Sequence, residues 1–164
     1  MPKHLLLATH LLYLRYVLRH KWFVFWAGLE LGVPVWQLII HDWHKFLPDE
    51  WFAYARNFYG TPAQKEDPGT REGFSRAWLK HQNRAPHHWQ YWIRLEDSGQ
   101  EVVMKMPDRY KREMLADWIG TGMAITGSNN VLTWYTNTRS GRKLHAGTQL
   151  WVENQIGYVE EATE

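Results

Sequence analysis

The stretch His41-Asp42-Trp43-His44-Lys45 follows directly on an apolar run at residues 35–40. A buried helix that ends in adjacent His and Asp residues aims an imidazole and a carboxylate at one point. Both groups bind divalent transition metals. Residues 34–44 therefore predict a helix that presents two metal ligands near its C-terminal end.

Further candidate ligands lie on both sides of this pair. They are His20, His81, His87, His88 and Asp117. Imidazoles and carboxylates on several helices can enclose two metal ions and leave positions open for water and substrate. The chain has no cysteine, so thiolate ligands are excluded. We expect divalent transition metal ions (Mn, Fe, Co, Ni or Zn), two of them if all the groups are used.

Other polar residues near these ligands have predicted roles. Glu113 lies four residues before Asp117 on one helix face, so it can support the metal shell or orient a His. Lys45 follows Asp42 by three residues; it either contacts a substrate phosphate or is a solvated lysine at a helix end. His44 is expected to face substrate or support a ligand. We therefore assign Asp42, Lys45 and Glu113 to catalysis.

Composition limits the classes of protein to which the chain can belong. With 164 residues, 45% of them hydrophobic and 15% aromatic, residues 1–164 are expected to form one globular domain. A net charge of +2 gives no strong signal for nucleic-acid binding. No stretch of 18 or more apolar residues is free of charge, so no membrane span is expected and a cytoplasmic location is predicted.

Apolar periodicity and helix-end signals predict an all-α bundle of roughly five to seven helices. The predicted helices cover residues 5–19, 21–31, 34–44, 49–59, 71–82, 107–125 and 148–161. Residues 61–70 are expected to be an exposed loop. Residues 91–106 are expected to form a small β-hairpin, with a helix that extends through Leu95 as the alternative. The eleven Trp residues are expected mostly in the core or in a pocket wall, including those at 22, 26, 36, 43 and 51.

The order of these ligands resembles that of the HD superfamily of metal-dependent phosphohydrolases. The residues that match its four metal-binding positions are His20, His41, Asp42 and Asp117. Binuclear branches add two His between the pair and the last Asp, and here His81 with His87 or His88 resembles them. The resemblance implies a compact helical domain around one or two metals.

Two narrower resemblances bear on the substrate. Residues 41–45 resemble the His-Asp-x-x-Lys motif of the cyclic-dinucleotide phosphodiesterase branch, in which the Lys contacts phosphate, but the Gly-Tyr-Pro signature of that branch is absent after His88. The chain also resembles an uncharacterised, largely phage-encoded family related to HD proteins. That similarity runs from about His20 to Val152, through Trp78, His81, Asn83, His87-His88, residues 113–118 and Trp134-Tyr135.

The resemblance implies a metal-dependent phosphohydrolase or phosphodiesterase that acts on a nucleotide or a related phosphate ester. A non-haem di-iron oxygenase is the alternative, because one branch of the superfamily binds two irons with the same ligand types. A non-catalytic ligand-binding module is the second alternative. The expected partner is a small phosphorylated substrate, and the sequence is compatible with a homo-oligomer. If the chain is encoded by a phage, its expected location is the cytoplasm of the host.

Overall fold

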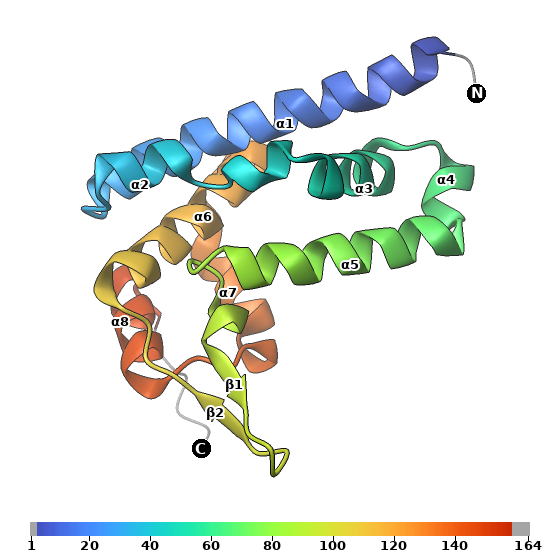
Figure 1. The fold of residues 1–164 in the computed structure, drawn as a ribbon. Helices are drawn as coiled ribbons and strands as arrows, with labels where there is room; N and C mark the ends of the chain where they lie inside the picture. The colour runs from blue at the N-terminus through green and yellow to red at the C-terminus, as the bar shows by residue number, and fades with distance from the viewer. Residues whose placement is uncertain (1–2, 159–164) are drawn as a thin grey trace.

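The computed structural model describes residues 3–158, and Figure 1 shows how their helices are arranged. The helices are α1 (Lys3–Glu30), α2 (Val35–Ile40), α3 (Pro48–Tyr59), α4 (Pro62–Glu66), α5 (Pro68–Arg84), α6 (Asp108–Thr126), α7 (Val131–Thr138) and α8 (Ala146–Ile156), with short 3-10 helices η1 (Trp43–Phe46), η2 (Trp89–Trp92) and η3 (Arg139–Gly141). One antiparallel hairpin joins β1 (Ile93–Leu95) to β2 (Glu101–Val103), with Ile93 opposite Val103. The mostly α-helical fold with one small hairpin is confirmed.

α1 is one continuous helix where the sequence predicts two. Residues 5–27 contain neither Gly nor Pro, so nothing in this stretch interrupts the backbone hydrogen bonds. The helix ends near Gly32, whose φ of 73° lies in the left-handed region that glycine adopts most readily. His20 consequently sits in the middle of a long rigid helix.

The helix predicted over residues 34–44 ends earlier, at Ile40. His41 leaves the helical region with ψ at 126°, and Asp42 adopts a left-handed conformation with φ at 56° and ψ at 21°. Among residues with a side chain, Asp is one of the few that tolerate this conformation. The His-Asp pair therefore lies in a turn between α2 and η1, which corrects the prediction that it lies on a helix.

Three other segments differ from the prediction. The expected loop at residues 61–70 contains α4, because Thr61 and Gln64 form a reciprocal capping box. α7 was not predicted, because its β-branched and polar residues have weak helix propensity. α8 starts two residues before Thr148 and ends at Ile156, where Gly157 adopts a left-handed conformation; the predicted end at residue 161 lies outside the described residues.

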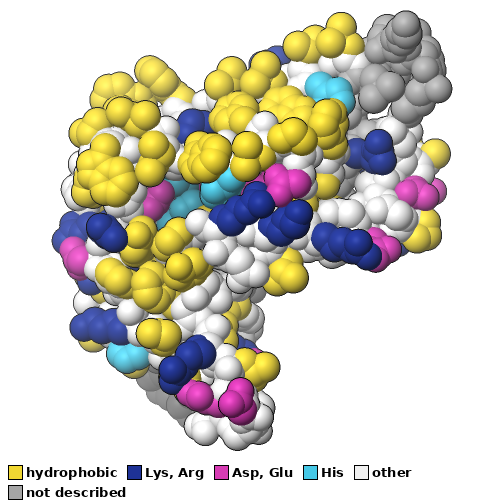
Figure 2. Space-filling model, in the orientation of Figure 1, with side chains coloured by type: hydrophobic (Ala, Val, Ile, Leu, Met, Phe, Trp, Pro, Cys, Tyr) yellow, Lys and Arg dark blue, Asp and Glu magenta, His cyan; other side chains and the backbone are white. Residues whose placement is uncertain are grey.

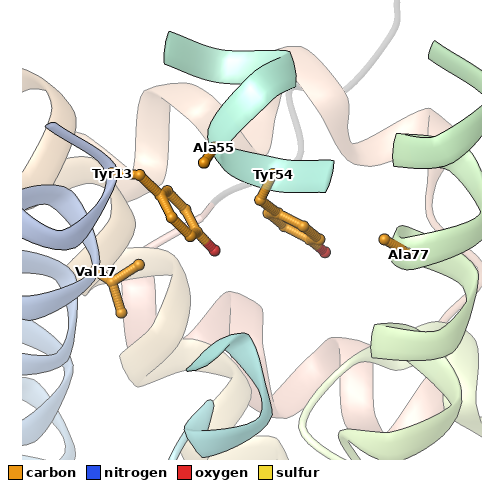
Figure 3. Packing of buried hydrophobic residues seen from close by; sticks show 5 residues of the cluster. All are labelled: Tyr13, Val17, Tyr54, Ala55 and Ala77. Atoms are coloured by element: carbon orange, nitrogen blue, oxygen red, sulfur yellow. The ribbon is translucent and has the colours of Figure 1, made fainter. Parts of the chain in front are cut away.

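α1 lies along one side of the molecule, and α2, α3 and α6 pack against it (Figure 1). Its N-terminal half contributes Tyr13 and Val17 to a core shared with α3 and α5 (Figure 3). Its C-terminal half packs Val24 and Ala27 against Ala116 of α6. A third core joins α6 to α7 and α8 around Met114, Tyr135 and Val152. Because α1 belongs to two cores, it fixes α5 and α6 relative to one another.

The contact between α1 and α6 depends on Gly120. A Cβ atom at this position would lie 2.7 Å from the backbone N of Val24 and 2.9 Å from its Cα, and closer still to its Cγ2. Gly120→Ala is expected to destabilise the fold by about 1–3 kcal/mol, because the backbone of α1 must move. The matched control is Gly73→Ala in α5, where a Cβ meets nothing within 4 Å. This control should gain about 0.5–1 kcal/mol, and urea unfolding of both variants measures the difference.

Several Trp residues are exposed, which corrects the prediction that they belong to the core or a pocket wall. Trp22, Trp26, Trp36 and Trp43 keep 50–59% of their surface exposed, whereas Trp51 packs against the core of α1, α3 and α5. Figure 2 shows hydrophobic side chains gathered over α1, α2 and the start of α3. Within residues 3–158 no helix is long and apolar enough to cross a bilayer.

Candidate metal centre

The residues predicted as metal ligands converge where α1, α5 and α6 meet the turn after α2. They are His20 in α1, His41 and Asp42 in the turn, His81 in the last turn of α5, His87 and His88 after α5, and Asp117 in α6. Figure 2 shows histidine side chains beneath the turn that connects α2 to η1. Among the described residues the donor atoms form four groups, within each of which they lie no more than 4.8 Å apart, and two of these groups consist of predicted ligands alone.

The first group joins His20, His41 and Asp117 to one carboxylate oxygen of Asp42. His20 Nε2 lies 3.2 Å from Asp42 Oδ2 and 3.2 Å from Asp117 Oδ1. His41 Nε2 lies 3.4 Å from Asp42 Oδ2 and 3.6 Å from Asp117 Oδ1. Two imidazole nitrogens and two carboxylate oxygens are thus directed at one small volume, as around a four-coordinate metal.

The second group uses the other oxygen of Asp42. His81 Nε2 and His87 Nε2 lie 3.5 Å and 3.4 Å from Asp42 Oδ1. His88 Nε2 lies 2.8 Å from His81 Nε2 and completes the group. Both His87 and His88 belong to this group, so the geometry makes each of them a candidate ligand. Asp42 is the only described residue common to these two groups, with one oxygen facing each.

Carboxylates outside the two groups hold the imidazole rings in place. Glu113 Oε1 lies 2.9 Å from His41 Nδ1 and 3.4 Å from His87 Nδ1. Glu50 Oε2 lies 3.0 Å from His81 Nδ1. Because a carboxylate only accepts, each Nδ1 must donate, and the opposite nitrogen, Nε2, is left to face the centre. This is how proteins orient histidine ligands toward a metal.

The pKa values of His87 and Glu113 indicate that their side of the centre attracts positive charge. Burial alone would lower the pKa of His87, but its contacts with Asp42 and Glu113 raise that pKa to about 10. Burial would also raise the pKa of Glu113, yet hydrogen bonds from His41 and His87 bring it to about 2. Burial and the neighbouring imidazoles hold the pKa of His88 well below its usual value. Buried carboxylates that outnumber the buried ammonium of Lys45 create this demand for cations.

Three buried atoms that face the centre lack a hydrogen-bond partner of good geometry in the described chain. They are His41 Nε2, Asp42 Oδ1 and His87 Nε2. Buried polar atoms in native proteins are nearly always paired, so an unpaired set calls for an explanation. Their type and direction fit first-row transition metals, which take imidazole nitrogen and carboxylate oxygen together.

Lys45 is buried beside this centre. Its Nζ lies 2.6 Å from Asp42 Oδ2, and the residue is 9% exposed. Burial would lower the pKa of Lys45, but the charges of Asp42 and Asp117 raise it above its usual value. The alternative of a solvated lysine at a helix end is therefore wrong, while contact with phosphate stays a prediction.

A pocket of about 670 Å³ opens onto the centre. Lys45, His88 and Asp117 contribute to its wall, together with aromatic side chains from both halves of the molecule. On the side formed by α6 and α7, Arg142 lies over the ring of Trp134, with 4.0 Å between Cζ and the ring centroid. A small molecule in this pocket would be close to the candidate metal ligands and to two cationic side chains.

Sequence reasoning missed Glu50 and Thr121. Glu50 is fully buried and also contacts His44 Nδ1 at 3.2 Å, so His44 supports the outer carboxylate as one of its predicted roles allows. Thr121 Oγ1 lies 3.4 Å from His20 Nδ1. In the sequence, Glu50 looks like an ordinary acid in the first turn of a helix. Its spacing does not distinguish that role from the role of a carboxylate that orients a histidine.

Comparison with known proteins gives one result. A family model described as a family of unknown function, DUF5662, matches residues 9–158. The chain belongs to this family. The match to DUF5662 includes every candidate ligand from His20 to Asp117. No curated protein and no solved structure matches the chain, so the resemblance to the HD superfamily stays a prediction.

Glu113 offers a test of the outer carboxylates in this DUF5662 chain. Glu113→Gln keeps the shape of the side chain but removes the charge that both His41 and His87 contact. Metal affinity is expected to fall by about 10- to 100-fold, as measured by competition with a chelator of known affinity. Glu72→Gln, which changes an exposed acid paired with Arg76, is the matched control and should bind metal normally. Unchanged affinity in both variants would show that Glu113 does not support the ligands.

Proposed function

We propose that the chain is a metal-dependent hydrolase of phosphate esters with a binuclear centre. The observation that carries this proposal is the position of Asp42, whose two oxygens each face a separate group of imidazoles. A carboxylate in this position can bridge two cations a few ångströms apart, the arrangement used in two-metal phosphoryl chemistry. The order of the ligands, which resembles that of the HD superfamily, supports the same reaction class.

The reaction joins the oxygen of a water molecule to phosphorus, breaks the ester P–O bond, and leaves a proton on the departing alcohol. Two bound cations would supply Lewis acidity and lower the pKa of water. The carboxylates of Asp42 and Asp117 supply negative charge to the centre. Glu113 fixes the orientation of the His41 and His87 rings. The Lys45 ammonium stands where it can neutralise charge that develops on a phosphoryl oxygen.

The pocket supports a substrate that combines an anionic group with an apolar or aromatic body. Trp78, Trp118 and Trp134 are part of its wall and offer flat surfaces on which a base can stack. Arg142 provides a second cation away from Lys45. A nucleotide or a related phosphate ester has this combination of properties, and we propose that class as the substrate.

A di-iron oxygenase is the second candidate. The observation that favours it is the donor set itself, because imidazoles and carboxylates around a bridging Asp also suit iron. Nothing in the ligand chemistry separates the two reactions. They differ in whether a redox-active metal and dioxygen are needed.

Elemental analysis and turnover under controlled metals test the proposal. Protein purified without chelator should contain close to two first-row transition metals per chain. Protein loaded with Zn, or with Mn under strict anaerobiosis, should hydrolyse some member of a panel of phosphate mono- and diesters. Activity that requires both iron and dioxygen would establish the oxygenase instead. Failure to take up any of Mn, Fe, Co, Ni or Zn would refute the metal centre and favour a non-catalytic module.

A further inference from the structure

Two tyrosine hydroxyls near the candidate centre have no hydrogen-bond partner among the described residues. They belong to Tyr13 of α1 and Tyr54 of α3, which are 0% and 5% exposed, with ring centroids 6.2 Å apart. Figure 3 shows that both hydroxyls end in the space between α1 and α5. An unpaired buried hydroxyl costs about 1–3 kcal/mol, and phenylalanine would pack there without that cost.

The pocket explains why these hydroxyls are directed inward. Tyr13 and Tyr54 are part of the wall of the cavity to which Lys45 and Asp117 also contribute. Burial raises the pKa of both hydroxyls above the usual value, and the charge of Lys45 acts against this rise. The hydroxyls therefore stay protonated and can donate hydrogen bonds beside a buried ammonium group.

We propose that Tyr13, Tyr54 and Lys45 together form a binding site for the tetrahedral oxyanion of the substrate, a phosphoryl group, beside the metal centre. Two neutral donors and one cation match an anion that carries several acceptor oxygens. The metal ligands hold one side of the group, and the hydroxyls contact oxygens on the other. This inference rests on the proposed function for the identity of the anion.

A purely structural role for the hydroxyls makes the opposite prediction about stability. If they bind a partner that maintains the fold, Phe at either position should lower the thermal midpoint. If they await substrate, Tyr13→Phe and Tyr54→Phe should leave the midpoint of the metal-loaded protein unchanged or raise it. The two variants remove one oxygen atom each and keep the aromatic packing between α1 and α3.

The test measures binding of inorganic phosphate to the metal-loaded full chain by calorimetry. Each Phe variant should weaken binding by about five- to thirtyfold, and the double variant should weaken it further. Tyr59→Phe is the matched control, because Tyr59 lies in the same aromatic cluster but outside the pocket wall. It should bind phosphate like the wild type.

The outcomes separate this inference from the proposed function. Phe variants that bind phosphate within twofold of wild type, or that lose several degrees of thermal midpoint, would overturn the oxyanion site even if the protein hydrolyses esters. Phosphate binding that depends on both hydroxyls, in a protein that hydrolyses no ester, would keep the site and refute the hydrolase. A wild-type protein that neither binds phosphate nor hydrolyses esters would refute both.

Discussion

Asp42→Ala is expected to abolish activity and to remove both metal ions at once. Every other ligand belongs to one of the two groups, but Asp42 gives one oxygen to each. If Asp42 bridges two cations as proposed, its loss weakens both positions together. Turnover should fall by at least about a thousandfold, equivalent to roughly 4 kcal/mol, and elemental analysis should find less than one metal per chain.

Two further variants make this result interpretable. Asp42→Asn retains the size of the side chain and tolerates the left-handed backbone, so a folding defect from lost backbone preference is avoided. Asp97→Ala removes an exposed acid in the hairpin turn and should keep full metal content and activity. An Asp42→Asn protein that retains one metal would mean that the two groups bind independently, and the bridge would be wrong.

Lys45→Met is expected to separate substrate binding from metal binding. The variant keeps the aliphatic volume of a buried side chain and removes only the ammonium group. Turnover of a phosphate ester should fall by one to a few orders of magnitude, about 1.5–4 kcal/mol of charge stabilisation. Metal content should stay at the wild-type level, because Lys45 is not a ligand. Its ammonium group competes with a metal ion for Asp42, and the variant removes this competitor.

The control for Lys45 is Lys143→Met. Lys143 is an exposed cation that pairs with Glu101 of the hairpin, so its loss should change neither turnover nor metal content. Steady-state kinetics and elemental analysis on the same preparations measure both properties. If Lys45→Met loses its metals, the ammonium organises the centre. If it turns over like the wild type, phosphate contact is refuted.

The sequence allowed the cluster of candidate ligands to be predicted, because metal chemistry restricts residue types more strongly than packing does. His20, the His41-Asp42 pair and Asp117 could be grouped without knowledge of the turn that positions them. The mostly helical class followed from apolar periodicity, which long segments such as α3 and α6 display clearly.

Other features depend on tertiary contacts that no local pattern contains. The end of α2 at Ile40 coincides with the left-handed conformation of Asp42, whose carboxylate contacts His20 of α1 and His81 of α5. Glu50 could not be distinguished from a helix-capping acid, because its role is defined by His81 on another helix. The exposure of Trp22 and Trp36 likewise could not be predicted, because the sequence of a helix with apolar residues on several faces does not show which face is buried.

The wide separation of the ligands along the chain has a consequence for biosynthesis. His20 Nε2 lies 3.2 Å from Asp117 Oδ1, although the two residues are 97 positions apart in the chain. A ribosome must therefore complete α6 before both ends of the centre exist together, and α6 must dock on α1 through Gly120 before they meet. Because closing so long a loop costs conformational entropy, early capture of metal by His20 alone cannot organise the chain. We expect metal to enter a nearly finished fold, so that starvation for metal after translation leaves a folded chain that can still be loaded.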